Sequence, residues 1–296
     1  MEILPQLLVN SLISGSIYAL ASAGLALVYG LLRVLNFAHG HFMMVGAYAF
    51  YFLAVEQAYG LPASAAFALL VIVLLAALSF KIFVEPFASL SFFLPFVTTL
   101  SLATIFESSV SIIFDVNVKS LTSGFEINSL SFAGIFITPV QIVIILSALV
   151  LLGLIAFIIH STSLGRRIRA LSQDDYAGQA LGVSKKKINY LVFISGAVLA
   201  AYAGILIGYE TNLQPTMGNA YTIKAFAAMI LGGLGNLWGT IAGAYVLGLV
   251  ENLSIGIDFW GYSLPAGYKD AFAFVMILLV LLFKPRGLFN KEAREA

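Results

Sequence analysis

The sequence has no cysteine and little charge. Without cysteine, the 296 residues can form no disulfide, thiolate metal site, iron–sulfur cluster or cysteine nucleophile. Charged residues make up 10% of the chain, against about 25% in a soluble domain. Hydrophobic residues make up 61%, and the mean hydropathy is +1.01. This composition excludes a soluble globular domain, a disordered chain and a nucleic-acid binder, and it predicts an all-α, polytopic integral membrane protein.

The scarcity of histidine and the absence of nucleotide motifs argue against a metal site and against catalysis. His39 and His41 are two residues apart, so they would not share a helix face, and His160 is distant in the sequence. A zinc site without further ligands is not expected. No stretch fits the phosphate-binding pattern G-x-x-x-x-G-K-[ST]. We therefore expect no catalytic residue, no metal and no cofactor, and any ATP would be bound by a separate subunit.

Strongly charged residues divide the chain into apolar blocks, which we interpret as membrane helices because lipid satisfies no exposed backbone groups. The blocks are residues 7–32, 37–55, 62–80, 92–114, 135–159, 188–209, 225–250 and 271–283. A helix needs about 20 apolar residues to cross the hydrocarbon core of a bilayer. The pattern predicts about eight to nine membrane segments in a single transmembrane domain over residues 1–296.

Basic residues gather in two segments, and this distribution indicates an orientation. Residues 160–187 and the tail 284–296 together hold ten of the fifteen Lys and Arg residues. Cytoplasmic segments carry an excess of Lys and Arg, so we expect both segments to be cytoplasmic. Five blocks precede residue 160, which places the N-terminus outside and leaves Lys119, Lys224 and Lys269 as the basic residues on the outer side.

The Gly-rich block 225–250 is not expected to be a simple span, because two cytoplasmic segments must be separated by an even number of crossings. It is either a re-entrant loop or two short helices that meet near Gly232–Asn236, and broken helices often mark a transport pathway. Gly235, Gly239 and Gly243 are spaced four apart and would share one helix face. That face predicts either ordinary helix packing or a seam beside a moving, pore-lining element.

Glu107 is an acidic residue inside the apolar block 92–114. A buried carboxylate in a membrane is costly unless it is paired or hydrated, so it is by default a functional candidate. Glu107 could hold a coupling ion among the neighbouring serines. It could also lie near the outer interface, about two helical turns from Asp115.

Two parts of the chain share a weak pattern. Asn36, Gly40 and Gly46-Ala-Tyr resemble Asn236, Gly239 and Gly243-Ala-Tyr. The blocks 7–32 and 188–209 would run in opposite directions, which fits an inverted repeat. Chance matching in a chain rich in Gly and Ala explains the pattern equally well.

Residues 160–187 form the most charged segment of the chain. Leu164, Ile168 and Leu171 make an apolar stripe at helical spacing, and Ser161 or Ser163 could cap the helix. A basic amphipathic helix of this kind either lies on anionic membrane lipid or docks into a groove on a partner.

Four stretches of the sequence closely resemble LivH-type permeases, the membrane subunits of branched-chain amino-acid ABC importers. The most specific is the string Asn36-Phe-Ala-His39-Gly40, within the opening 14–40. The other stretches are 164–183, 224–239 and 268–288, so the resemblance covers nearly the whole chain. Two features depart from the family pattern: residues 87–91 lack a basic stretch, and Glu107 stands where an uncharged polar residue is expected.

The resemblance implies a permease subunit that translocates branched-chain amino acids delivered by a periplasmic or extracellular binding protein. It implies a LivM-like second permease and two cytoplasmic ATPase subunits as partners. It also implies a multi-pass location in a bacterial or archaeal cytoplasmic membrane, in contact with lipid and with no nucleic acid. A permease for urea or short amides is the near alternative, and an ion-coupled secondary transporter that uses Glu107 is the distant one.

Two sets of site residues are expected. The residues expected to couple the permease to the ATPase are Leu164, Gly165, Arg166, Arg167, Asp174, Asp175, Leu181 and Gly182. The candidates for the pathway or a hinge are Asn36, His39, Gly40, Glu107, Gly235, Asn236, Gly239 and Gly243.

Overall fold

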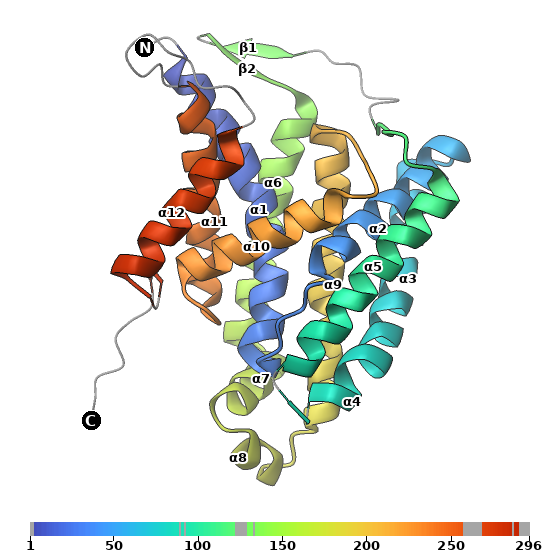
Figure 1. Cartoon of the computed structure of the whole chain (residues 1–296), viewed down its shortest axis with the longest axis vertical. Helices are drawn as coiled ribbons and strands as arrows, with labels where there is room; N and C mark the ends of the chain where they lie inside the picture. The colour runs from blue at the N-terminus through green and yellow to red at the C-terminus, as the bar shows by residue number, and fades with distance from the viewer. Residues whose placement is uncertain are drawn as a thin grey trace.

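The computed structural model describes residues 3–88, 90–91, 93–121, 129–132, 134–256, 268–285 and 287–289. Apart from one short antiparallel pair of strands, the regular structure in these residues is helical, as the composition predicted (Figure 1). The elements are α1 (Leu4–Leu32), α2 (His39–Tyr51), η1 (Phe52–Glu56), α3 (Leu61–Ser79), η2 (Phe80–Val84), α4 (Glu85–Ala88), α5 (Phe93–Phe114), β1 (Leu130–Phe132), β2 (Ile135–Ile137), α6 (Pro139–Ser161), α7 (Ser163–Gln173), α8 (Asp175–Ala180), α9 (Lys185–Glu210), α10 (Met217–Gly232), α11 (Leu237–Gly256) and α12 (Lys269–Phe283).

Five helices of the described residues are long and apolar enough to cross a membrane. They are α1, the continuous helix Leu61–Ala88 that joins α3 to α4, and then α5, α6 and α9. α10 and α11 pass the same test together, as a pair bent by 117°. α2 has 13 residues and α12 has 15, so both are shorter than the span of about 20 residues that a bilayer requires. The all-α membrane class is therefore supported, whereas five or six of the expected eight to nine segments meet the length criterion.

Local sequence explains where several helices begin. Pro5 and Pro62 stand in the first turns of α1 and α3, where a missing backbone N–H removes no helical hydrogen bond. Thr138 and Gln141 form a capping box at the start of α6: each side chain accepts a hydrogen bond from the other residue's backbone N–H, at 3.3 and 3.0 Å. These signals place the helix starts before any tertiary contact is considered.

α1 lies at the centre of the bundle and α6 at its edge. In the most apolar 18-residue stretch of each helix, 83% of the stretch is buried in α1, whereas 17% is buried in α6. Exposed aliphatic side chains, including Leu146, Leu149 and Val150, cover the outer face of α6. An apolar surface of this extent predicts contact with lipid or with another membrane subunit, because water would solvate it poorly.

Glycine lets the central helices cross in direct backbone contact. A Cβ on Gly24 of α1 would lie 2.6 Å from the carbonyl oxygen of Gly196 on α9. On α2, a Cβ on Gly40 would lie 2.2 Å from the carbonyl oxygen of Gly218 on α10. Because real Cβ atoms essentially never lie within 3.0 Å of such atoms, both crossings require glycine, as in other membrane helix interfaces built from small residues.

The two blocks that the sequence matched do run in opposite directions. α1 and α9 are antiparallel in Figure 1. Residues 33–38 connect α1 to α2, and the same number of residues, 211–216, connects α9 to α10. Asn36 lies between α1 and α2, whereas Asn236 lies between α10 and α11, so these two matched residues do not both follow the antiparallel pair. The inverted repeat stays a prediction.

The Gly-rich block is broken where the sequence predicted. α10 and α11 meet at residues 233–236, and Gly233 and Gly235 have positive φ angles of 108° and 80°, which favour glycine. The helices on either side have 16 and 20 residues. They extend beyond the expected block 225–250 because polar residues such as Thr222 lie inside α10 and do not end it.

Candidate functional site

α7 lies at one end of the bundle, opposite the start of α1 (Figure 1). Its cap is Thr162, whose Oγ1 accepts a hydrogen bond from the backbone N–H of Gly165 at 3.1 Å. The expected caps, Ser161 and Ser163, were wrong by one position, because Ser161 ends α6 and Ser163 is already the first residue of α7. Gly165 is buried, since a Cβ there would lie 2.1 Å from the carbonyl oxygen of Ile159.

The two faces of α7 differ as the periodicity predicted. Leu171 is buried, and Leu164 packs against the core. Arg166 and Arg167 are exposed. Arg169 instead donates a hydrogen bond to a carbonyl oxygen at the end of α6. α7 therefore presents two of its three arginines outward and is anchored to the bundle by the third.

The acidic residues of the expected coupling set hold α8 in place. Asp174 caps α8, with its Oδ1 accepting hydrogen bonds from the backbone N–H groups of Tyr176 and Ala177 at 2.8 and 3.0 Å. Asp175 forms an ion pair with Lys185 at the start of α9. Both contacts lie within the chain, so these two residues act through the geometry of α8 rather than through free charges.

Two large side chains are exposed near the two ends of α8, Tyr176 in its first turn and Leu181 directly after its last residue. Tyr176 is 87% exposed and Leu181 is 81% exposed. Gly182 follows with a positive φ of 82°, which makes the turn toward α9. The sequence singled out Leu181 and Gly182 but missed Tyr176, for which the only signal was an aromatic residue in a charged segment.

Asn36, His39 and Gly40 are buried where the chain enters α2. Asn36 Oδ1 accepts a hydrogen bond from the backbone N–H of Ala38 at 3.1 Å. His39 Nε2 lies 2.8 Å from the carbonyl oxygen of Ala21 on α1. The backbone N–H of Gly40 donates to Thr222 Oγ1 on α10 at 3.0 Å. The three residues thus lie buried at the junction of α1, α2 and α10.

Glu107 on α5 contacts two other helices. Its Oε2 accepts a hydrogen bond from Asn219 Nδ2 on α10 at 2.9 Å and lies 3.5 Å from His41 Nε2 on α2. The Glu107 side chain is 29% exposed and that of His41 is 1% exposed. A partnered and partly exposed carboxylate fits the interfacial interpretation of Glu107. The sequence did not predict that His41 and Asn219 contact Glu107, because the three residues lie on three separate helices.

The break between α10 and α11 is held by the start of the C-terminal tail. Asn236 Oδ1 accepts a hydrogen bond from the backbone N–H of Gly239, and Asn236 Nδ2 donates to the carbonyl oxygen of Phe289, both at 3.1 Å. The backbone N–H of Leu288 donates to the carbonyl oxygen of Leu231 at 2.8 Å. The basic residues Arg286, Lys291 and Arg294 of the tail lie outside the described residues.

Of the three glycines that were expected to share one helix face, Gly239 and Gly243 lie on α11 and contact α10. A Cβ on Gly239 would lie 2.2 Å from the carbonyl oxygen of Gly232, and one on Gly243 would lie 2.4 Å from that of Ala228. Gly235 lies in the break and not on a helix, which corrects the prediction from spacing alone. The seam therefore packs α11 against α10 within one helical hairpin.

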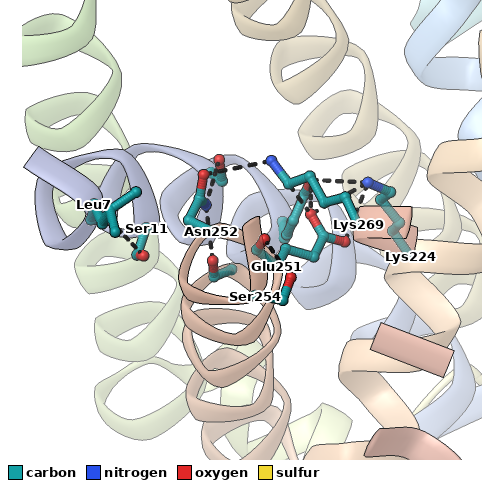
Figure 2. Close-up of polar contacts among 10 residues, drawn as sticks. Leu7, Ser11, Lys224, Glu251, Asn252, Ser254 and Lys269 are labelled. Carbon is teal, nitrogen blue, oxygen red and sulfur yellow. Dashed lines mark hydrogen bonds and ion pairs between the residues drawn. The ribbon is translucent and has the colours of Figure 1, made fainter. Parts of the chain in front are cut away.

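A cluster of charged residues around the buried Glu251 joins α1, α10, α11 and α12 (Figure 2). Glu251 on α11 is 0% exposed, and its Oε2 accepts a hydrogen bond from the Tyr18 hydroxyl at 2.7 Å. Lys224 Nζ lies 3.1 Å from Glu251 Oε1 and 3.1 Å from the Tyr18 oxygen. Lys269 Nζ lies 3.9 Å from Glu251 Oε2 and 3.4 Å from Asn252 Oδ1.

Sequence reasoning missed this cluster. It counted Lys224 among the residues outside the membrane, whereas Lys224 belongs to α10 and its side chain is 18% exposed. The available signal was a charged residue at each edge of the block 225–250, and charge inside a membrane protein is by default functional. Among the residues that the structure describes, no group of three or more His, Asp or Glu side chains is placed to hold a metal ion.

Comparison with known proteins finds relatives over nearly the whole chain. Residues 7–281 match a family model described as branched-chain amino acid transport system / permease component. The high-affinity branched-chain amino acid transport system permease protein BraD of Pseudomonas aeruginosa is 34% identical, covering 98% of this chain and 97% of its own. The corresponding LivH protein of Escherichia coli is 29% identical, covering 98% and 96%. Among solved structures, PsaBC from Streptococcus pneumoniae in complex with Fab shares the fold, with a TM-score of 0.52 at 11% identity over 94% of this chain and 91% of that one.

Proposed function

Because the chain belongs to the family of permease components of branched-chain amino acid transport systems, we propose that it is the membrane-spanning subunit of an ABC importer that translocates branched-chain amino acids. The observation that carries the proposal is the match over 98% of the chain to BraD, a permease protein of branched-chain amino acid transport. The long apolar helices and the exposed aliphatic face of α6 support a location in the membrane.

The proposal includes a topology for residues 1–296 as one transmembrane permease domain. It has about eight to nine segments in a bacterial or archaeal cytoplasmic membrane, with α2 and α12 as the shorter ones and α10–α11 as the broken one. The N-terminus lies outside, and residues 160–187 and 284–296 are cytoplasmic. The exposed arginines of α7, at the end of the bundle opposite the start of α1, support this orientation.

Residues 160–187 form the coupling loop, on which two cytoplasmic ATPase subunits dock. The surface combines Arg166 and Arg167 with the exposed Tyr176 and Leu181. Arginine and aromatic side chains are enriched at the centres of protein interfaces. The cap and the ion pair of α8 make this surface rigid, so that movement of a docked ATPase would be passed on to the helices.

A LivM-like second permease completes the pathway, and a periplasmic or extracellular binding protein delivers the amino acid to the outer face. The two permeases alternate access by rigid-body movement around the pathway. ATP-driven closure of the ATPases biases this movement through contacts that differ between the two states. The chain itself is not an enzyme in this scheme.

The alternatives are a permease for urea or short amides and an ion-coupled transporter that uses Glu107. The printed names of the relatives specify branched-chain amino acids, which favours the first proposal over the amide alternative. The hydrogen bond from Asn219 gives Glu107 a partner on a neighbouring helix, so its presence does not require a coupling ion.

The test is reconstitution of the chain with a second permease, the ATPases and the binding protein in proteoliposomes. We expect uptake of leucine, isoleucine and valine that requires both ATP and the binding protein, with no uptake of urea or acetamide above that of empty vesicles. Uptake of urea or acetamide in place of leucine would establish the amide alternative. Uptake that needs an ion gradient rather than ATP, and that is lost in Glu107→Gln, would establish the ion-coupled one.

A further inference from the structure

A small cavity lies beside the cluster of charged residues in Figure 2. Its volume is about 170 Å³, and residues of α10, α11 and α12 form it. Lys224 and Glu251 are its charged lining residues, and the others are apolar, among them Leu247, Phe274 and Ile277. One wall therefore carries an ion pair and the remaining walls are hydrophobic, which is the arrangement of a site for a small ligand with a charged end and an apolar end.

One oxygen of the Glu251 carboxylate has unused acceptor capacity. Oε2 accepts the hydrogen bond from Tyr18, whereas Oε1 is buried and makes no hydrogen bond within the described residues. Lys224 Nζ contacts both oxygens of the carboxylate, Oε1 at 3.1 Å as an ion pair and Oε2 at 3.3 Å as a hydrogen bond. A carboxylate oxygen can accept more than one hydrogen bond, so Oε1 can also accept from a donor on a ligand in the cavity.

An α-amino acid carries an ammonium and a carboxylate group close together, as the ion pair does. In such a molecule the ammonium nitrogen and the carboxylate carbon are about 2.5 Å apart, as standard bond lengths and angles require. Lys224 Nζ and Glu251 Oε1 are 3.1 Å apart. A zwitterion placed across the pair in the opposite sense would donate from its ammonium to Glu251 and accept from Lys224, both as charge-assisted hydrogen bonds. A ligand with a single charge would satisfy one residue and leave the other unmatched.

The size of the cavity suits an aliphatic side chain. An apolar protein cavity of about 150 Å³ admits benzene, and branched side chains of three or four carbons are smaller than that ring. Leu247, Phe274 and Ile277 offer the hydrophobic walls for such a side chain.

The cavity opens between α10 and α12. Ile223 and Phe274 line it and are 44% and 46% exposed. A zwitterion does not enter from hydrocarbon, because both of its charges would lose their solvation at once. A site for such a ligand therefore requires this opening to border an aqueous passage in the assembled importer.

We propose that the cavity between α10, α11 and α12 is a binding site for α-amino acids with branched aliphatic side chains, in which Glu251 binds the ammonium group and Lys224 binds the carboxylate. The assignment rests on the proposed import function and adds the place in this chain that recognises the substrate. Tyr18 and Lys269 are positioning residues, since both hold the other carboxylate oxygen of Glu251.

The experiment compares the wild-type importer with an apolar variant that carries Tyr18→Phe, Lys224→Met and Glu251→Leu together. Removing one charge alone would leave its partner unmatched, whereas replacing a whole ion pair with apolar residues is often tolerated. Lys269, the second cation near Glu251, keeps Asn252 Oδ1 as a hydrogen-bond partner at 3.4 Å. The matched control is Glu85→Gln, which removes another helix-linking carboxylate, the one that pairs with Lys186 across α4 and α9 at 2.8 Å.

Three quantities are measured in proteoliposomes: assembly with the ATPases, ATP hydrolysis stimulated by leucine-loaded binding protein, and leucine uptake. We expect the apolar variant to assemble and to lose at least tenfold in leucine uptake, while the control keeps ATP hydrolysis and uptake within twofold of wild type. Uptake of the apolar variant within twofold of wild type would overturn the site and leave the import function intact. Absence of leucine uptake by the wild type would overturn the import function itself.

A second measurement needs no variant and therefore decides the matter if the apolar variant fails to assemble. Radiolabelled leucine is bound to the detergent-solubilised wild-type importer without binding protein. Valine should displace it, whereas 4-methylpentanoate and 3-methylbutylamine, each with one of the two charges, should displace it at least tenfold less well. Equal displacement by either single-charge analogue, or no binding of leucine, would overturn the proposal.

Discussion

Replacing Gly40 with alanine tests the close crossing of α2 and α10. The new Cβ would lie 2.2 Å from the carbonyl oxygen of Gly218 and 2.4 and 2.5 Å from Oγ1 and the backbone nitrogen of Thr222. Ordinary van der Waals contact begins at 3.4 Å, and two of the three atoms belong to backbone that no rotamer change can move. The helices must therefore separate by about 1 Å, and overpacking of this kind is destabilising.

The magnitude follows from two contributions. Overpacking in a tight interior costs about 1–3 kcal/mol. Separation of the helices also weakens the hydrogen bond from Gly40 N–H to Thr222 Oγ1, which now measures 3.0 Å, and such a bond contributes about 1 kcal/mol. The expected loss is about 2–4 kcal/mol, which corresponds to a fall in Tm of roughly 4–8 °C for a chain of this size.

The assay is thermal unfolding of the purified protein in detergent micelles, with Gly153→Ala as the control. Gly153 lies inside α6, and a Cβ there would have no neighbour within 4 Å. Alanine is favoured over glycine in a helix interior by about 0.5–1 kcal/mol, so the control should melt at or slightly above the wild-type temperature.

The same chemical change, glycine to alanine, is thus expected to lower the Tm at position 40 and to leave it unchanged or raise it slightly at position 153. If Gly40→Ala melted within about 1 °C of Gly153→Ala, the crossing would not be as close as the structure has it. The close packing at the junction of α1, α2 and α10 would then lose its main support.

Three further predictions concern the ends and edges of the bundle. Charge reversal with Arg166→Glu and Arg167→Glu together should lower co-purification of the ATPase subunits at least tenfold. Lys81→Glu, which reverses an exposed cation elsewhere, should not. Equal loss in the α7 variant and in the Lys81 variant would contradict docking on α7. Asp174→Ala should speed amide exchange at the first turn of α8 by removing its cap, at a cost of about 1 kcal/mol, and Asp174→Asn should restore protection; a fast-exchanging Asn variant would exclude capping as the cause. Glu107→Gln should keep ATP-dependent leucine uptake within twofold, because the amide oxygen can still accept from its neighbour, and abolished uptake would return the carboxylate to a role in transport.

Part of the site could be predicted because its signals are local. The apolar stripe of α7 depends on residues three and four positions apart, so Leu164 and Leu171 were placed correctly on the inward face and Arg166 and Arg167 on the outward one. The break at residues 233–236 was also local, because glycines that need positive φ stand next to each other there. The cap of α7 was misplaced by one residue, since Ser161, Thr162 and Ser163 are equivalent caps by residue type alone.

Contacts between helices were the part that sequence patterns did not supply. Lys224 and Glu251 are 27 positions apart, and Tyr18 is 233 positions from Glu251. Glu107 meets Asn219 across 112 positions. In the sequence each of these residues is a separate polar group inside or outside an apolar block, because a helical pattern does not indicate which other helix a residue faces.

The sequence by itself determined that the chain is an all-α membrane protein, because 10% charge and 61% apolar content leave no surface for water and lipid allows only internally bonded backbone. It also determined the family, through strings such as 36–40 and 231–236. Only the tertiary structure decided that an ion pair borders a cavity, that Gly24 meets Gly196, and that Asn236 holds the returning tail. The reason is physical: the period of a helix is set by its own backbone, whereas its rotation and its neighbours are set by how side chains of distant segments pack together.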